Sequence, residues 1–214
     1  MKKIVFVLIG MIAFQNSFAQ SDSNAENLLE SVYHKIRSYE NISLDFDYSL
    51  YNETADIRQD TKGSIILQDS LYRFDYMGIK QLFNGAKVIT VVEENEEVTI
   101  VDKSDEQDSI SPSNLFDFYR DGYTYQMDIE QKTPEGLVQF VKLIPIDSDS
   151  EMDHYLLGIL VEQLQIYKLI QKGNNGTVTT ISVKNFTTNT SIDTNAFVFD
   201  RAKYEELGYY IIED

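Results

Sequence analysis

A strict alternation of apolar and polar side chains begins at residue 42 and constrains the fold more than any other feature of this chain. Every second position up to residue 50 is apolar, and the positions between them carry serine or aspartate. Successive side chains of a β-strand point to opposite faces, so this stretch predicts a strand with one apolar and one solvated face. The apolar positions are Ile42, Leu44, Phe46, Tyr48 and Leu50.

Similar stretches recur along most of the chain and are separated by turn signals. Asn84-Gly85 is one such signal, and the polar run Glu93-Glu94-Asn95-Glu96 is another. Short strands joined by tight turns predict an antiparallel meander. Further strands are expected at about 63–68, 71–77, 79–83, 86–93, 97–103, 122–132, 137–146, 176–187 and 196–200.

Residues 155–171 fit two interpretations. The apolar positions from 156 to 164 have helical spacing, whereas those from 164 to 170 have the spacing of a strand. We favour two strands with a turn near Glu162-Gln163.

One helix is expected immediately before the first strand. Ser23-Asn24-Ala25-Glu26 has the form of a capping box, and apolar residues at helical spacing then predict an amphipathic helix over residues 24–39. Leu28, Val32 and Ile36 share one face of this helix, so we expect them to pack on the sheet.

A second, shorter helix is expected in the middle of the chain. Ser111-Pro112 has the pattern of an N-cap followed by proline at the first helical position. Leu115, Phe116 and Tyr119 would then form an apolar face that lies over the sheet.

The N-terminal residues have the order of a cleaved secretory signal peptide. Two lysines precede a nearly unbroken apolar run over residues 4–14, and small residues stand at positions 17 and 19. The run is shorter than the roughly 20 apolar residues that a transmembrane helix needs. We expect residues 1–19 to be a signal peptide cleaved near Ala19, and residues 20–214 to form one exported domain.

Composition excludes several classes of function. The chain has 18 basic and 35 acidic residues, and removal of the signal would leave 16 basic residues and a net charge of −19. Such a field repels a phosphate backbone, so we expect no nucleic-acid partner. The absence of cysteine excludes disulfides, thiolate metal sites and a lipid-modified cysteine at the cleavage site.

The sequence lacks the common catalytic signatures, so we expect neither enzymatic activity nor a cofactor. It has no nucleophile elbow, no H-E-x-x-H motif and no glycine-rich nucleotide loop. The acidic run from Asp147 to Asp153 resembles a calcium loop, but Met152 and Gly158 stand where that loop needs glycine and glutamate. We therefore expect no metal site.

A sheet with one apolar face must bury that face, and two short helices can cover only part of it. Large side chains can fill the remainder, or it can form a cavity for an apolar ligand, and the pattern is compatible with both. The positions that would line such a cavity are Phe46, Tyr48, Ile65, Leu67, Tyr72, Phe74 and Tyr76. The helices that would form its lid carry Leu28, Val32, Ile36, Leu115 and Phe116.

Several short motifs follow one another in order over nearly all of the expected mature chain. They are Tyr39-x-Asn41-Ile42-x-x-x-Phe46, Gly63-x-Ile65-x-Leu67, Leu71-Tyr72-Arg73-Phe74, Phe83-Asn84-Gly85, Ser111-Pro112-x-x-Leu115-Phe116, Leu143-x-Pro145 and Phe197-x-Phe199. This ordered set resembles the LolA family of periplasmic lipoprotein carriers. The resemblance implies an α+β fold in which an antiparallel sheet is curved into an open half-barrel and covered by a few amphipathic helices.

The resemblance also implies a function and partners. A LolA-like carrier accepts the acyl chains of a lipoprotein from an ATP-driven extractor at the inner membrane and delivers them to an acceptor at the outer membrane, without a cofactor. We accordingly expect a periplasmic monomer that acts as a chaperone for lipoproteins. An alternative function is an envelope-stress or signalling module that senses lipid or protein with the same half-barrel fold.

The sequence departs from the family at one step. The best-known carriers have an Arg-Pro step after the strand that corresponds to Gly63–Leu67, and the arginine helps to hold the lid closed. Here that step reads Gln68-Asp69-Ser70. Control of the lid by that arginine is therefore not expected in this chain.

Overall fold

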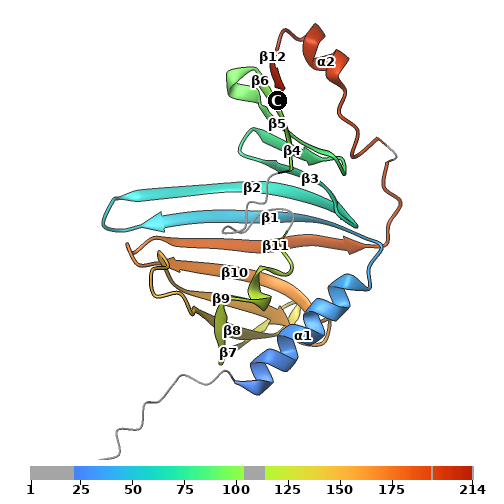
Figure 1. Ribbon diagram of the computed structural model, residues 1–214. Helices are drawn as coiled ribbons and strands as arrows, with labels where there is room; N and C mark the ends of the chain where they lie inside the picture. The colour runs from blue at the N-terminus through green and yellow to red at the C-terminus, as the bar shows by residue number, and fades with distance from the viewer. Residues whose placement is uncertain (1–21, 104–113, 194, 214) are drawn as a thin grey trace, which may run out of the picture.

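The computed structural model describes residues 22–103, 114–193 and 195–213. The predicted signal peptide and the predicted N-cap Ser111-Pro112 lie outside the described residues. Within them the chain forms one twelve-stranded β-sheet and two α-helices (Figure 1). None of the described helices combines the length and apolarity that a bilayer crossing requires.

The elements follow one another in a simple order. They are α1 (Ser23–Arg37), β1 (Asn41–Asn52), β2 (Ile57–Gln68), β3 (Leu71–Tyr76), β4 (Ile79–Phe83), β5 (Lys87–Val92), η1 (Glu93–Asn95), β6 (Glu97–Asp102), η2 (Phe118–Arg120), β7 (Tyr123–Thr133), β8 (Gly136–Pro145), β9 (Met152–Leu160), β10 (Gln165–Gly173), β11 (Val178–Thr188), α2 (Arg201–Glu206) and β12 (Tyr210–Glu213).

Two meanders, β1–β6 and β7–β11, make up most of the sheet and meet in its middle. The strand order is β12-β6-β5-β4-β3-β2-β1-β11-β10-β9-β8-β7. Antiparallel pairing of β1 with β11 joins the meanders and places Phe46 opposite Val183 and Tyr48 opposite Ile181. The predicted antiparallel meander is thus confirmed for β1 to β11.

The interpretation of residues 155–171 as two strands is also confirmed. β9 ends at Leu160 and β10 starts at Gln165, so the turn lies where it was expected. Leu164 adopts a positive φ of 52° in that turn. The helical spacing arose because Leu157 and Leu160 belong to opposite faces of one strand, and both faces are buried there.

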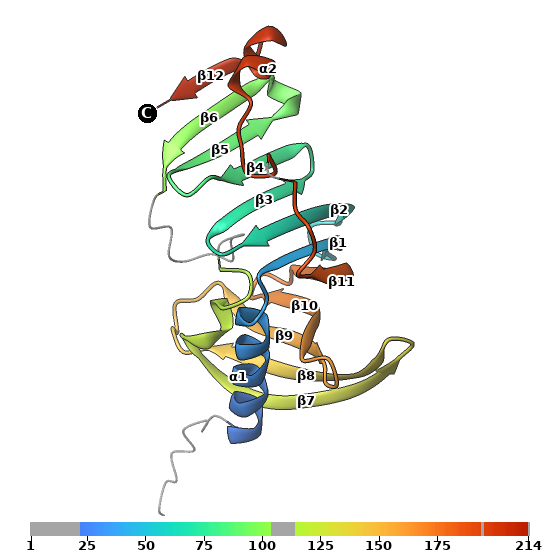
Figure 2. The same ribbon diagram turned by 90° about the vertical axis from the view of Figure 1, so that its right-hand side faces the viewer.

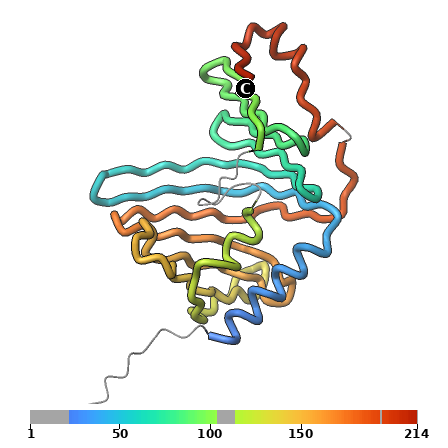
Figure 3. Tube along the Cα trace, viewed as in Figure 1, coloured from blue at the N-terminus to red at the C-terminus, as the bar shows by residue number. Residues whose placement is uncertain are grey.

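The predicted strand at 196–200 is wrong. Asp193 accepts hydrogen bonds from the backbone of Asn195 and Ala196, and these bonds form a turn. Asp200 then caps α2 by accepting a hydrogen bond from the Lys203 backbone. The final strand β12 pairs in parallel with β6, a contact that the local pattern does not indicate. Figure 3 shows the chain leaving β11 and reaching the far edge of the sheet.

Both helical predictions need correction, the first at its N-terminal cap and the second in its continuity. α1 is capped by Asp22, whose carboxylate accepts a hydrogen bond from the Asn24 backbone 2.8 Å away, so Ser23 is the first helical residue and not the cap. The expected helix up to Tyr119 is not continuous in its described part. Residues 114–117 form turns, and only a short 3₁₀ turn over Phe118–Arg120 follows.

α1 lies across one face of the sheet and contacts β7 and β10 (Figures 1 and 2). Its buried stripe is Ala25, Leu29, Val32 and Ile36. Leu28 is partly buried and packs against the same cluster. We call this cluster of α1, β1, β2 and β7–β10 residues the main core; it includes Leu44, Phe46, Ile65, Val141, Leu143, Leu157, Ile159, Ile166 and Leu169.

A second cluster, the C-terminal core, lies on the other face of the sheet. Leu82 is the register partner of Arg73, so it points away from the face that carries Phe74. Leu82 packs on the buried positions of β5 and β6. The C-terminal core consists of Ile89, Val91, Val98 and Ile100, packed against Leu82, Phe199, Tyr204, Tyr209 and Ile211.

Candidate functional site

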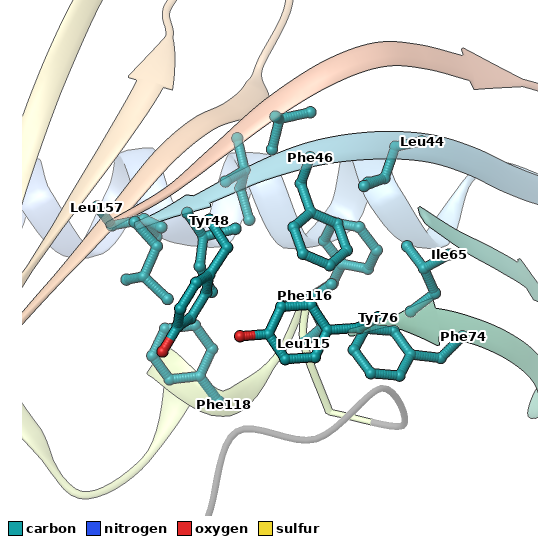
Figure 4. Close-up of a pocket in the computed structure, with 14 residues that line it drawn as sticks. Leu44, Phe46, Tyr48, Ile65, Phe74, Tyr76, Leu115, Phe116, Phe118 and Leu157 are labelled. Atoms are coloured by element: carbon teal, nitrogen blue, oxygen red, sulfur yellow. The ribbon is translucent and has the colours of Figure 1, made fainter. Parts of the chain in front are cut away.

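An apolar cavity of about 280 Å³ lies between the middle of the sheet and residues 115–118 (Figure 4). Among the residues that the structure describes, only leucine, isoleucine, valine, phenylalanine and tyrosine line it. The lining residues are Leu44, Phe46, Tyr48, Ile65, Phe74, Tyr76, Leu115, Phe116, Phe118, Leu157, Ile166, Leu169, Ile181 and Val183. Of the two possibilities that the sequence left open, a filled core or a cavity, the described residues form a cavity within a partly filled core.

Aromatic rings from β1 and β3, the two strands that flank β2, form one wall of this cavity. The rings of Phe46 and Phe74 lie 6.0 Å apart and are nearly parallel. Tyr76 lies 5.8 Å from Phe74 and 5.1 Å from Tyr48, measured between ring centroids. Such ring pairs contribute packing energy beyond that of their buried area, so the wall is built to hold its shape.

Gly63 makes room for the central ring of this wall. It is the register partner of Phe46 on β2, and a Cβ at this position would lie 2.3 Å from Phe46 Cζ and 2.7 Å from the Asp75 carbonyl oxygen. Only glycine lets the Phe46 ring lie flat across β2 towards β3.

Residues 115–120, which we call the roof segment, close the cavity on the side away from the sheet. Leu115, Phe116 and Phe118 project from the roof segment into the cavity lining. Tyr119 points elsewhere and is fully buried in the main core, and its hydroxyl has no hydrogen-bond partner in the described structure. Burial raises the pKa of this hydroxyl, which therefore stays protonated at neutral pH.

Charged groups fasten the roof segment to α1. The Arg37 guanidinium lies 3.2 Å from the Asp117 carboxylate, and Arg120 lies 3.6 Å from Glu30. The Arg120 guanidinium also stacks 3.8 Å from the ring centroid of Tyr33. These groups are half-exposed, and exposed ion pairs contribute about 0–1 kcal/mol each, so the ion pairs themselves add little to the attachment of the roof segment to α1.

The structure brings together five of the seven residues that the sequence predicts for the cavity wall. Phe46, Tyr48, Ile65, Phe74 and Tyr76 all line the cavity. The remaining two lie on the same face but nearer one end of their strands. Leu67 lines a neighbouring groove beside the end of α1, and Tyr72 packs against Phe83, 5.9 Å away between ring centroids.

The predicted lid residues divide in a similar way. Leu115 and Phe116 line the cavity, whereas Val32 and Ile36 are buried in the main core and Leu28 packs at its margin. α1 therefore covers the sheet beside the cavity, and the roof segment covers the cavity itself.

Half of the lining was not singled out from the sequence. These residues are Leu44, Phe118, Leu157, Ile166, Leu169, Ile181 and Val183. The alternation marked Leu44 as inward-facing, so a signal was present there. Ile181 and Val183 also alternate, but nothing local shows that β11 lies next to β1.

Polar residues outside the cavity form no metal site in the described part of the chain. His154 is buried and its Nδ1 lies 2.7 Å from the carboxylate of the adjacent Asp153. Among the described residues, no three histidine or acidic side chains lie close enough to hold a metal ion. The apolar lining of the cavity favours the binding of an apolar ligand.

A scan of family models gives no match to this sequence, and neither does a search of curated proteins. Solved structures do match. An uncharacterised conserved protein of Thermus thermophilus aligns with a TM-score of 0.59 at 10% identity, over 89% of this chain and 99% of that one. LprF of Mycobacterium bovis aligns with a TM-score of 0.50 at 9% identity, over 82% and 98%.

A LolA superfamily protein of Nitrosomonas europaea also aligns, with a TM-score of 0.45 at 10% identity, over 82% of this chain and 98% of that one. Identities this low extend the likeness to the fold alone. The chain therefore shares its fold with the Thermus thermophilus protein and with LprF.

Proposed function

We propose that this protein is an exported carrier that binds the acyl chains of lipoproteins in the apolar cavity and delivers them to the outer membrane. The observation that carries the proposal is the lining of the cavity, which has no charged side chain among the described residues. Transfer of hydrocarbon from water into such a site is favourable by about 0.8 kcal/mol per methylene. A hydrocarbon chain is the ligand that gains most from this lining.

The size of the cavity supports a carrier whose roof opens. Its volume of about 280 Å³ lies just below the range for ligand sites, roughly 300–1,000 Å³. A single chain is the largest ligand suited to the closed form, and an anchor with several chains requires displacement of the roof segment. The weak ion pairs between the roof segment and α1 add little to the cost of that displacement, which comes mainly from the apolar side chains of the segment.

The proposal includes a location, a shape and partners. The N-terminal pattern supports export to the periplasm with cleavage near Ala19, so that residues 20–214 act as a single domain. We propose an open half-barrel around the cavity, with an inner-membrane extractor as donor and an outer-membrane protein as acceptor. The acidic surface would keep the carrier away from anionic membrane surfaces. Its role is binding and delivery, not catalysis.

The test is to purify the protein from the periplasm and to identify bound acyl chains or lipidated proteins by mass spectrometry. Val183→Trp places a large ring in the cavity lining, whereas Ser182→Trp places the same ring on the opposite face of the same strand. We expect lipid with the wild type and with Ser182→Trp, and little or none with Val183→Trp.

Lipid bound equally by both variants would place the ligand outside the cavity. A wild type that carries no lipid and binds none in vitro would overturn the proposed function. Copurification of an unlipidated protein in place of lipid would favour the sensing module instead.

A further inference from the structure

Two tyrosine hydroxyls are the only polar side-chain groups among the described residues that line the cavity. They belong to Tyr48 on β1 and Tyr76 on β3, and every other lining residue is a hydrocarbon side chain. Their rings meet edge to face with centroids 5.1 Å apart, and Figure 4 shows the Tyr76 hydroxyl directed towards Tyr48. The polarity of the cavity is therefore concentrated at one place.

The two hydroxyls form a donor for a ligand. Each hydroxyl carries one proton and can accept as well as donate, so one proton stays available to a ligand even when one hydroxyl donates to the other. Burial and the neighbouring Tyr48 hydroxyl raise the pKa of Tyr76. Tyr76 therefore remains neutral at physiological pH and does not act as a phenolate.

The pair also marks the point at which the inward positions of β2 change from apolar to polar, while β1 continues with Leu50. Towards one end of β1 and β2, the inward-facing positions are Leu44 and Ile65. Towards the other end, Tyr48 is the register partner of Thr61, and the next inward position on β2 is Gln59. A ligand with an apolar tail and a polar head can match this gradient in one direction only.

We infer that Tyr48 and Tyr76 form a head-group subsite that hydrogen-bonds the ester or amide carbonyl of an acyl chain whose tail lies against Phe46, Phe74 and Ile65. The inference rests on the proposed function and narrows its ligand class to acyl esters and amides. A free carboxylate is disfavoured, because no lysine, arginine or histidine stands among the described lining residues to offset its desolvation.

The experiment measures displacement of the neutral dye N-phenyl-1-naphthylamine by three probes: methyl laurate, a linear alkane of matched length, and laurate at pH 8. The proteins are the wild type, the double variant Y48F/Y76F, and Tyr51→Phe as control. Tyr51 lies on β1 with its side chain on the opposite face. All three substitutions keep the ring, and matching thermal midpoints confirm that the variants are folded.

The wild type and Tyr51→Phe are expected to bind methyl laurate more tightly than the alkane and more tightly than laurate. Y48F/Y76F should bind methyl laurate about 2- to 10-fold more weakly, the effect of one neutral hydrogen bond, with alkane binding unchanged.

Equal affinity of the wild type and Y48F/Y76F for methyl laurate overturns the subsite and leaves the proposed function intact. Tighter binding of laurate than of methyl laurate by the wild type also overturns the ester assignment. Failure of every probe to bind the wild type overturns the proposed function and the subsite together.

Discussion

The main core and the C-terminal core belong to one sheet but bury opposite faces of it. In the main core, a helix of 15 residues and the roof segment cover a wide face formed by many strands, and the cover leaves a cavity. In the C-terminal core, four buried side chains of β5 and β6 meet aromatic rings from the last residues of the chain. A narrow face can be filled by a few rings, whereas a wide face under a short cover keeps space for a ligand.

The largest expected effect tests whether α1 is an indispensable part of the main core. Val32 is fully buried on α1, so Val32→Asp introduces a charge without a partner. Such a change costs at least about 3–5 kcal/mol and should abolish folding or lower the denaturation midpoint sharply. Val198→Asp, at a position 62% exposed beside the C-terminal core, is the control and should be near neutral. Equal midpoints for the two variants would contradict the placement of α1.

The second prediction compares the two regions directly with the same substitution. Ile100→Ala in the C-terminal core, 5% exposed, should cost about 2–5 kcal/mol because it opens a void in a filled cluster. Ile181→Ala in the cavity wall should cost less, because part of the side chain already faces space and has fewer contacts to lose. Denaturation midpoints measure the loss of stability in both variants, and dye binding is measured beside them. If Ile181→Ala proves as costly as Ile100→Ala, the cavity region is packed like the C-terminal core.

A third test concerns the ring wall. Gly63→Ala should cost about 1–3 kcal/mol, because the added Cβ meets the Phe46 ring and a backbone oxygen of β3. The displaced ring should also lower the affinity of the cavity for an apolar dye. Ser64→Ala, the adjacent residue on the opposite face, should leave both properties unchanged. Unaltered stability of Gly63→Ala would show that the wall is loose.

The smallest effect is expected from the unpaired hydroxyl in the main core. Tyr119→Phe removes a buried group without a partner, so stability at pH 7 should stay the same or rise by up to about 1–3 kcal/mol. The folded pKa of Tyr119 lies above its ordinary value of 10.0, so the wild type should lose stability as the pH rises beyond 10. Tyr119→Phe should lose less over that range, as measured by denaturation at pH 7 to 11. A loss of stability at pH 7 in Tyr119→Phe would mean that the hydroxyl has a partner. Tyr204→Phe makes the same substitution in the C-terminal core and serves as the matched control.

Much of the fold could be predicted from the sequence, because the signals involved are local. A period of two fixes which side chains share a strand face, so Phe46 with Tyr48, and Phe74 with Tyr76, were assigned to common faces before any pairing was known. The apolar stripe of α1 was equally visible. Residues 57–62 of β2 are not predicted because all but Ile57 are polar and most are exposed, so they carry no alternation of hydrophobicity.

Tertiary structure alone decided how these local units combine. Pairing of β1 with β11 joins residues about 140 positions apart and brings Ile181 and Val183 to the cavity. The same kind of long-range pairing places β12 beside β6, and strand register determines that Leu67 and Tyr72 fall outside the cavity lining. The pattern of a strand states which residues face inward, because alternation is a property of the backbone. It does not state what lies opposite them. That depends on contacts between segments far apart in the sequence, and the free energy of such a contact depends on both segments together.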